Sequence, residues 1–280
     1  MALKIEALYC GDLHLDSSFL VQYRNPGLPA TVRTVSYLIH GAKAGPILVD
    51  TGYRSPEMME TIGMKASTAH GHGLEKELER RGLRPADVRY IIHTHLHMDH
   101  AGKDDLFPDA TTVIFNRREL EVGCGGLGGM GYPLQDMKHM IDRVYTPNAA
   151  WILDLQDSGP VELMEHIAVQ WAGGHTEGSM NVLIETDEGI ACICGDIIYH
   201  VQDQVIAPYN SLNVREPKIT GHTTMSMQQE KGAVKRALNA GTWLLPMHDA
   251  PAKVEKGGLI VGRVTGAMVP GPVTLLGAGV

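Results

Sequence analysis

The stretch that decides the fold is His95-Leu96-His97-Met98-Asp99-His100, which carries three imidazoles and one carboxylate. On an extended segment the side chains of His95 and His97 leave the same face and can close on one ion. Asp99 and His100 follow directly, where a turn would direct them to a second ion beside the first. Imidazole and carboxylate ligands without a thiolate suit Zn²⁺, and also Fe, Mn and Co. The stretch therefore predicts a metal site.

The residues around this stretch predict that it lies at the end of a strand. Residues 88–92 form a short apolar, β-branched run, and Ala101-Gly102 follow the last histidine. Open α/β sheets bind ligands beyond the carboxyl ends of their strands. The alternative is a His-rich loop with one structural zinc, although structural zinc sites usually use Cys and do not carry surplus ligands.

Composition indicates a globular chain and argues against several partners. The 280 residues are 44% hydrophobic and carry a net charge of −8, so we expect one domain over 1–280, built from halves at about 1–150 and 151–280. No cluster of Lys and Arg is present to follow a phosphate backbone, which argues against nucleic acid. The first residues lack the layout of a signal peptide, and no apolar run is long enough to span a membrane. We therefore expect no membrane partner and a cytoplasmic location.

In the first half, apolar runs and turn residues predict strands at 4–9, 34–40, 46–49 and 111–115 and helices at 74–81 and 137–144. Residues 10–16, which include His14, are expected to form a loop, and the charged residues of 74–81, Glu77 among them, to face largely outward. The spacing of Asn116 and Glu119 is that of a helix capping box. The connection 53–73 is either a lid with flexible methionines or ordinary packing of a short helix. The Gly-rich 123–131 segment is either a mobile loop near a site entrance or a tolerated turn.

In the second half, strands are expected at 167–171, 180–186, 189–194 and, last, 242–246, with a helix at 223–238. Three of these strands run into a candidate ligand, namely His175 after two glycines, Asp196 after Gly195, and His248. Glycines before His175 let the backbone fold tightly so that the imidazole turns inward. The shared position at strand ends is the reason to group these three residues with the 95–100 stretch.

Taken together, these residues resemble the metallo-β-lactamase superfamily, in which two similar αβ halves form an αββα sandwich with the metals at one edge. The matching features run in order from the 48–52 strand end through 95–100, Gly174-His175 and Gly195-Asp196 to His248. The resemblance implies an α/β fold of this type and two divalent metal ions, with Zn²⁺ the first expectation. It implies that His95, His97 and His175 hold one ion, that Asp99, His100 and His248 hold the other, and that Asp196 bridges them.

Within the superfamily the layout is most similar to the N-acyl homoserine lactonases, the quorum-quenching enzymes, and related lactonases. Tyr199, three residues after Asp196, matches the tyrosine with which those enzymes contact the substrate carbonyl. The chain departs from that group in its 123–131 segment and in the tail after Pro251.

The expected activity is hydrolysis of a small-molecule lactone. Two cations can share a hydroxide that attacks the ester carbonyl. A metal and Tyr199 would stabilise the oxyanion, with Asp99 as a proton shuttle. The alternatives are another hydrolase with the same centre (thioester, cyclic amide, phosphotriester or β-lactam), a mono-iron persulfide dioxygenase, and a non-catalytic metal-binding module. Nothing in the sequence specifies a partner subunit, although the tail and the Met content would permit a homodimer.

Overall fold

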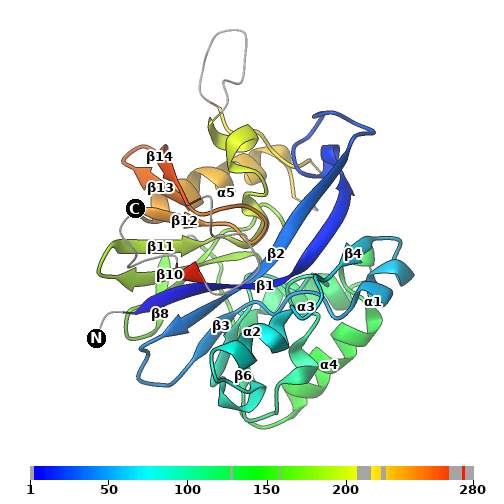
Figure 1. Cartoon of the computed structure of the whole chain (residues 1–280). Helices are drawn as coiled ribbons and strands as arrows, with labels where there is room; N and C mark the ends of the chain where they lie inside the picture. The colour runs from blue at the N-terminus through cyan, green and yellow to red at the C-terminus, as the bar shows by residue number, and fades with distance from the viewer. Residues whose placement is uncertain are drawn as a thin grey trace.

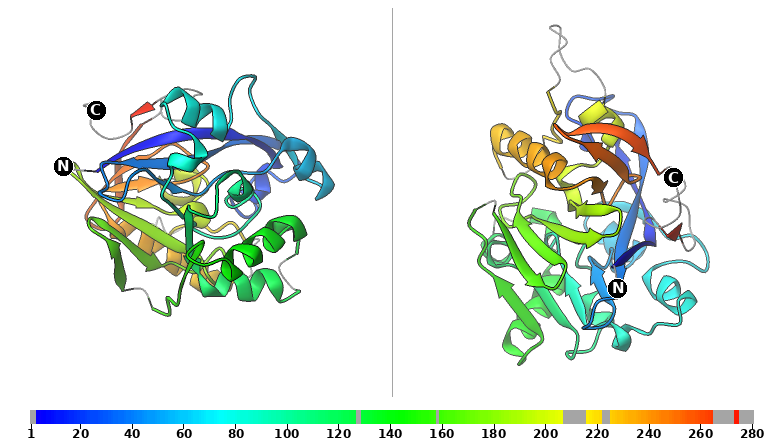
Figure 2. Two further views of the ribbon diagram at one scale, coloured as in Figure 1. Left: turned by 90° about the horizontal axis from the view of Figure 1, so that it is seen from below. Right: turned by 90° about the vertical axis from the view of Figure 1, so that its left-hand side faces the viewer.

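The structure is a computed structural model of the chain, and it describes residues 3–126, 129–157, 159–206, 216–221, 225–264 and 273–274. Two mixed β-sheets pack face to face, with helices on both outer sides (Figures 1 and 2). Among the described residues, no helix has the length and apolar character needed to cross a membrane.

The first sheet has the order β15-β1-β2-β3-β5-β6-β7, with β4 paired to β1. Strands β3, β5, β6 and β7 are parallel, whereas β1, β2 and β3 pair antiparallel. Its strands are β1 (Lys4–Asp16), β2 (Pro29–His40), β3 (Ile47–Val49), β4 (Lys65–Ser67), β5 (Tyr90–Ile92), β6 (Thr112–Asn116), β7 (Ala150–Leu153) and β15 (Val273–Thr274).

The second sheet has the order β14-β13-β12-β11-β10-β9-β8, and only its β11–β12 pair is parallel. Its strands are β8 (Pro160–Met164), β9 (Ile167–Trp171), β10 (Met180–Thr186), β11 (Gly189–Ile193), β12 (Trp243–Leu245), β13 (Ala252–Glu255) and β14 (Leu259–Arg263). The expected strand at 242–246 is therefore present, but it is not the last strand.

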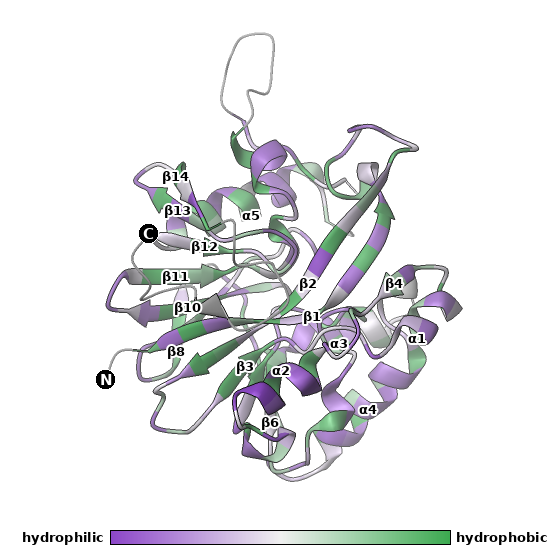
Figure 3. Ribbon diagram, viewed as in Figure 1, coloured by the Kyte–Doolittle hydropathy of each residue, from purple (hydrophilic) through white to green (hydrophobic). Residues whose placement is uncertain are grey.

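The helices are α1 (Pro56–Thr61), α2 (Leu74–Arg80), α3 (Arg117–Cys124), α4 (Leu134–Tyr145) and α5 (Met227–Ala240). Helices α2 and α4 pack on the outer face of the first sheet, and α5 packs on the outer face of the second. Hydrophobic residues concentrate in the strands, whereas the helices carry many hydrophilic residues (Figure 3). The αββα sandwich predicted from the sequence is confirmed.

The central core lies between the two sheets. It joins Ile5, Tyr37 and Val49 of the first sheet to Val182 and Ile193 of the second, all of them fully or almost fully buried. Burial of such side chains contributes about 1.5–3 kcal/mol each and is the main term that holds the sheets together. This packing fixes the edge of the sandwich at which the strands from both sheets end.

Strand β1 continues through residues 10–16, where the sequence predicted a loop. These residues pair with β2 and, from Asp12 to His14, also with β4. His14 bonds to Thr31 and Ser67 from the partner strands, which agrees with a hydrogen-bonding role. Pairing on both sides supplies the backbone hydrogen bonds that make this polar segment extended.

The connection 53–73 forms α1 and β4, and this structure favours the interpretation that the segment is an ordinary packed short helix. Met59 is fully buried in a cluster with Leu13, Met98 and Tyr199. Because β4 is hydrogen-bonded to β1, this segment is part of the sheet.

Two details of the helices differ from the prediction. Helix α5 begins at Met227 instead of residue 223, because Ser226 and Gln229 form a capping box there. In α2, Glu77 is fully buried instead of outward, and its carboxylate pairs with Arg80, Arg81 and His72.

Candidate metal centre

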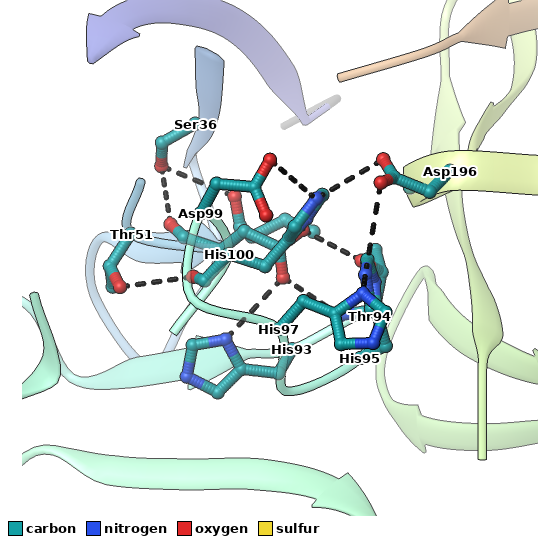
Figure 4. A network of polar contacts seen from close by, with 12 residues as sticks. Ser36, Thr51, His93, Thr94, His95, His97, Asp99, His100 and Asp196 are labelled. Carbon is teal, nitrogen blue, oxygen red and sulfur yellow. Dashed lines mark hydrogen bonds and ion pairs between the residues drawn. The ribbon is translucent and has the colours of Figure 1, made fainter. Parts of the chain in front are cut away.

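The candidate site lies at the edge where strands of both sheets end. The 95–100 stretch follows β5, His175 follows β9, Asp196 follows β11 and His248 follows β12. In Figure 4, Asp196 enters from the second half of the chain, opposite the stretch that carries Asp99 and His100. The two sheets therefore bring together all seven of the side chains that the sequence named as ligands.

The first group consists of His95, His97 and His175. The Nδ1 atom of His97 lies 3.1 Å from Nε2 of His95 and 2.9 Å from Nε2 of His175. Gly173 and Gly174, with φ of 57° and 85°, form the tight turn before His175. A Cβ on Gly174 would lie 2.4 Å from Cβ of Ala233, so this turn requires glycine.

The second group consists of Asp99, His100, Asp196 and His248. The Oδ1 atom of Asp196 lies 3.1 Å from Nε2 of His100 and 3.2 Å from Nε2 of His248. The Oδ2 atom of Asp99 lies 3.3 Å from the same His248 nitrogen. All four side chains are buried.

Asp196 connects the two groups. Its Oδ1 faces the second group, whereas its Oδ2 lies 3.8 Å from Nε2 of His95 and 3.6 Å from Nε2 of His175. One carboxylate thus presents one oxygen to each group, which is the arrangement of a shared ligand.

The distances fit a metal ion in each group. Tetrahedral ligands about 2.0–2.1 Å from zinc lie about 3.3 Å from one another. The shortest separations within each group are 2.9–3.3 Å, and those from Asp196 Oδ2 to His175 and His95 are 3.6 and 3.8 Å. Both oxygens of Asp196 and the Nε2 atoms of His100 and His248 are buried without a hydrogen-bond partner among the described residues. Buried polar atoms without partners are costly, and a cation between them would satisfy them.

Hydrogen bonds behind the ligands orient three of the imidazoles. The Nδ1 of His100 donates to Oδ2 of Asp50 at 2.7 Å, and that of His248 donates to the Arg33 carbonyl at 2.8 Å. The Nδ1 of His95 lies 3.2 Å from the Thr94 hydroxyl, which itself donates to Asp50. In each ring this arrangement leaves Nε2 as the nitrogen that faces the centre. Asp50, which directly follows β3, thus supports His100 from behind and, through Thr94, also His95.

Burial and neighbouring charges set the protonation of the site. Burial, together with the nearby imidazoles of His100, His97 and His175, lowers the pKa of His95 well below its usual value, so this ring is neutral. At His248, burial disfavours the charged form, but Asp196 and Asp99 outweigh it and raise the pKa to about 10. A proton and a metal ion therefore compete for the space between His248 and these carboxylates.

Tyr199 lies directly beside the second group. Its ring stacks on His248, and its edge approaches His175 with 5.9 Å between ring centroids. Burial and the negative charges of Asp196 and Asp99 raise the pKa of Tyr199 well above its usual value, so the phenol keeps its proton. The backbone N–H of Tyr199 donates to the Gln204 side chain at 2.6 Å, which fixes this loop.

The sequence did not identify the residues that pack around the first group. Tyr132 lies edge-on to His97, with ring centroids 4.8 Å apart, and a Cβ on Gly131 would lie 2.7 Å from the same ring. The 123–131 segment thus ends at the site, although residues 127–128 lie outside the described part of the chain.

Glu119 does not form the capping box that its spacing indicated. Asn116 caps α3 through the N–H of Arg118, whereas the carboxylate of Glu119 is fully buried and bonds to Leu96 and Thr176 next to the ligands. The spacing alone could not show this, because these partners come from distant segments.

Comparison with known proteins places this chain in a family. Residues 30–242 match the family model described as the metallo-beta-lactamase superfamily. An N-acyl homoserine lactonase of Bacillus cereus is 28% identical over 206 residues, which cover 70% of this chain and 76% of that protein.

Solved structures show the same fold. An N-acyl homoserine lactone hydrolase with N-hexanoyl-L-homoserine bound at its catalytic metal centre superimposes with a TM-score of 0.63 at 22% identity, covering 84% of this chain and 88% of the other. AidC, described as a dizinc quorum-quenching lactonase, gives a TM-score of 0.61 at 17% identity, covering 92% and 94%.

Proposed function

Because the chain belongs to the metallo-beta-lactamase superfamily and is a metal-dependent hydrolase of its lactonase-like group, we propose that it hydrolyses lactone rings at a dinuclear zinc centre. The proposed zinc ligands are His95, His97, Asp99, His100, His175, Asp196 and His248. These residues come from both halves, so neither half carries the centre alone, and we propose that 1–280 acts as one domain.

The observation that carries the proposal is the position of Tyr199. A buried, protonated phenol lies against His248, beside two groups of metal-binding side chains that share Asp196. A carbonyl oxygen placed at this edge would meet both the centre and a hydrogen-bond donor. This combination fits a site that hydrolyses an ester better than it fits a site that only binds a structural metal.

Bound metal ions would supply an activated water and a Lewis acid for the carbonyl oxygen. Asp196 fixes the two groups next to each other, because each of its oxygens faces one of them. The Tyr199 hydroxyl donates a hydrogen bond to the carbonyl oxygen as negative charge develops there, an effect typically worth about 3–4 kcal/mol. Asp99 takes up the proton that the attacking water loses and delivers it to the leaving alkoxide, so that the product is a hydroxy acid.

The relatives support the proposed substrate class. The Bacillus cereus relative is named as an N-acyl homoserine lactonase, and we propose an N-acyl homoserine lactone or a related small lactone as the substrate here, with quorum quenching as the biological consequence. Zinc is proposed because the ligands are imidazoles and carboxylates and because a structural neighbour is described as a dizinc enzyme.

The test is alkali uptake at constant pH during incubation with a substrate panel. The panel contains N-acyl homoserine lactones of several chain lengths, simple γ- and δ-lactones, a thioester, a phosphotriester and a β-lactam. We expect metal-dependent turnover of lactones and about two zinc equivalents by elemental analysis. Turnover of only the thioester or the phosphotriester would move the activity to another hydrolase class, and a single iron would favour the persulfide dioxygenase alternative.

A further inference from the structure

Glu119 is a buried carboxylate that no step of the proposed reaction uses. It lies in the first turn of α3 and has no exposed surface. Its Oε2 accepts hydrogen bonds from the backbone N–H of Leu96 at 2.8 Å and from the Tyr132 hydroxyl at 3.0 Å. Its Oε1 accepts from the Thr176 hydroxyl at 2.5 Å and from the N–H of Gly178 at 3.1 Å.

The donors to Glu119 come from the segments that carry the first group. Leu96 lies between His95 and His97, and Thr176 directly follows His175. The ring of Tyr132 lies edge-on to His97. One carboxylate therefore joins ligand loops that follow strands of different sheets, with Oε2 bonded to one loop and Oε1 to the other.

The fit around Glu119 is close. A Cβ on Gly178 would lie 2.5 Å from Oε1 and 2.7 Å from Cγ, so the second ligand loop can approach this closely only with glycine there. A buried carboxylate is tolerated when hydrogen bonds satisfy it, and the four donors do so. Both oxygens are needed, because each one serves a different loop.

The second group is held by other residues. His100 is oriented by Asp50, and His248 by the Arg33 carbonyl. Among the described residues, Glu119 accepts hydrogen bonds from the backbone between His95 and His97, from Tyr132 and from the loop after His175, whereas Asp99, His100 and His248 donate none to it. An effect of Glu119 on metal binding should therefore be unequal between the two groups.

We infer that Glu119 is a positioning residue that sets the separation of the two ligand loops and thereby the metal affinity of the His95–His97–His175 group. The inference rests on the metal centre of the proposed function, but not on the identity of the substrate. In Glu119→Gln the amide keeps one acceptor oxygen and turns its NH₂ toward the donors of the other loop, so one of the two attachments is lost.

The experiment titrates metal-free protein with Zn²⁺ alone, in competition with a chromophoric chelator. It compares the wild type with Glu119→Gln, Tyr132→Phe and Glu77→Gln, and records the melting temperature of each. Glu77→Gln is the matched control, because Glu77 is an equally buried carboxylate that bonds to residues on and beside α2, away from the ligands. Substitution of a residue that bonds to the metal ligands or holds their loops typically weakens metal binding about 10–100-fold.

We expect Glu119→Gln to weaken one zinc equivalent by about 10–100-fold and to leave the other unchanged. Tyr132→Phe, which removes one of the donors to Oε2, should weaken the same equivalent less. Glu77→Gln should lower the melting temperature without changing the zinc titration. Wild-type affinity for both equivalents in Glu119→Gln, with only a lower melting temperature, would overturn the inference.

If Glu119→Gln does not fold, Tyr132→Phe and Thr176→Val decide the question, because each removes one donor from a different oxygen of Glu119. Unchanged zinc binding in both variants would also overturn the inference, as would a wild type that binds no zinc. A wild type that binds two zinc equivalents but hydrolyses no lactone contradicts only the proposed function. Full lactone turnover with unaltered zinc affinity in Glu119→Gln contradicts only the role of Glu119.

Discussion

The phenol ring of Tyr199 stacks on the imidazole of His248, with ring centroids 5.1 Å apart and ring planes inclined by 6°. Tyr199 lies in the loop after β11 and His248 in the loop after β12, so the parallel pairing of these strands brings the two rings together. The stack holds the phenol at the edge of the proposed metal centre.

Replacing Tyr199 with phenylalanine should slow the reaction without removing the metals. The variant keeps the ring and its stack but loses the hydrogen-bond donor to the oxyanion, so kcat should fall about 10²–10³-fold. Steady-state kinetics on the best lactone and elemental analysis of the same preparation check this. Loss of zinc from Tyr199→Phe would show that the hydroxyl acts on the centre itself.

Tyr53→Phe is the control for that experiment. Tyr53 is also buried, and its hydroxyl donates to the carbonyl of Ser67 at 2.7 Å. Its removal should cost about 1 kcal/mol of stability, the usual value for one hydrogen bond. We expect turnover to stay at the wild-type level.

Asp50→Asn should weaken metal binding in the second group. The Oδ2 atom of Asp50 accepts from Nδ1 of His100, while Oδ1 accepts from the N–H of Thr94 at 2.8 Å. An amide cannot accept on both sides, and an NH₂ facing His100 would favour the tautomer with a proton on Nε2. The expected loss is about 10–100-fold in zinc affinity, measured by chelator competition.

Glu77→Gln controls for the loss of a buried carboxylate. Glu77 pairs with Arg80, Arg81 and His72, which belong to neither ligand group. This variant should be less stable than the wild type but should bind zinc normally. Equal zinc affinities in the two variants would mean that Asp50 contributes only to folding.

The ligand stretch could be predicted from the sequence because its information is local. His95 to His100 follow one strand, and the other three candidate ligands each follow a strand and lie close to glycines or a buried run. Parallel strands end at one edge, so strand-end positions were enough to predict that the side chains meet. The αββα arrangement followed from the resemblance that these residues carry.

The supporting residues could not be predicted, because their partners are distant in the sequence. Glu119 bonds to residues 23 and 59 positions away, whereas its helix-capping spacing indicated a local partner. Glu77 was expected on the outside of α2, but it is buried. The periodicity of a short helix does not reveal that Arg80, Arg81 and His72 surround its carboxylate. Residues 10–16 form a strand only because β2 and β4 pair with them.

The stability contributed by Asp136 should decrease as the pH rises between about 4 and 6. Burial, only partly offset by Arg54, raises the pKa of this carboxyl from 3.8 to about 6. In that range the folded protein holds a proton that the unfolded chain has released, so protonation favours the folded state at low pH and the advantage is lost as the pH rises through the folded-state pKa.

Asp136→Asn isolates this effect, because the amide does not titrate. The difference in unfolding free energy, wild type minus variant, should be largest near pH 4 and should fall toward pH 6 and above. Urea denaturation of both proteins across this range measures it. A difference that is flat, or that increases with pH, would contradict the raised pKa of Asp136.

Removal of the metals should lower the melting temperature as well as abolish turnover. Both oxygens of Asp196 and two facing imidazole nitrogens are buried without hydrogen-bond partners among the described residues, so the folded chain presents a site that the unfolded chain lacks. A ligand at 100 times its Kd stabilises the folded state by about 2.7 kcal/mol, which corresponds to roughly 5–10 °C in a protein of about this size. Calorimetry of the zinc-loaded protein, of the chelated protein and of the chelated protein after zinc is restored should show that shift and its reversal.

Replacement of a ligand should reduce the rise in melting temperature that zinc produces. The reduction should be larger in Asp196→Asn than in His97→Ala, because Asp196 faces both groups. If chelation leaves the melting temperature unchanged while turnover disappears, the metals do not bind to this buried cluster, and the ligand assignment fails.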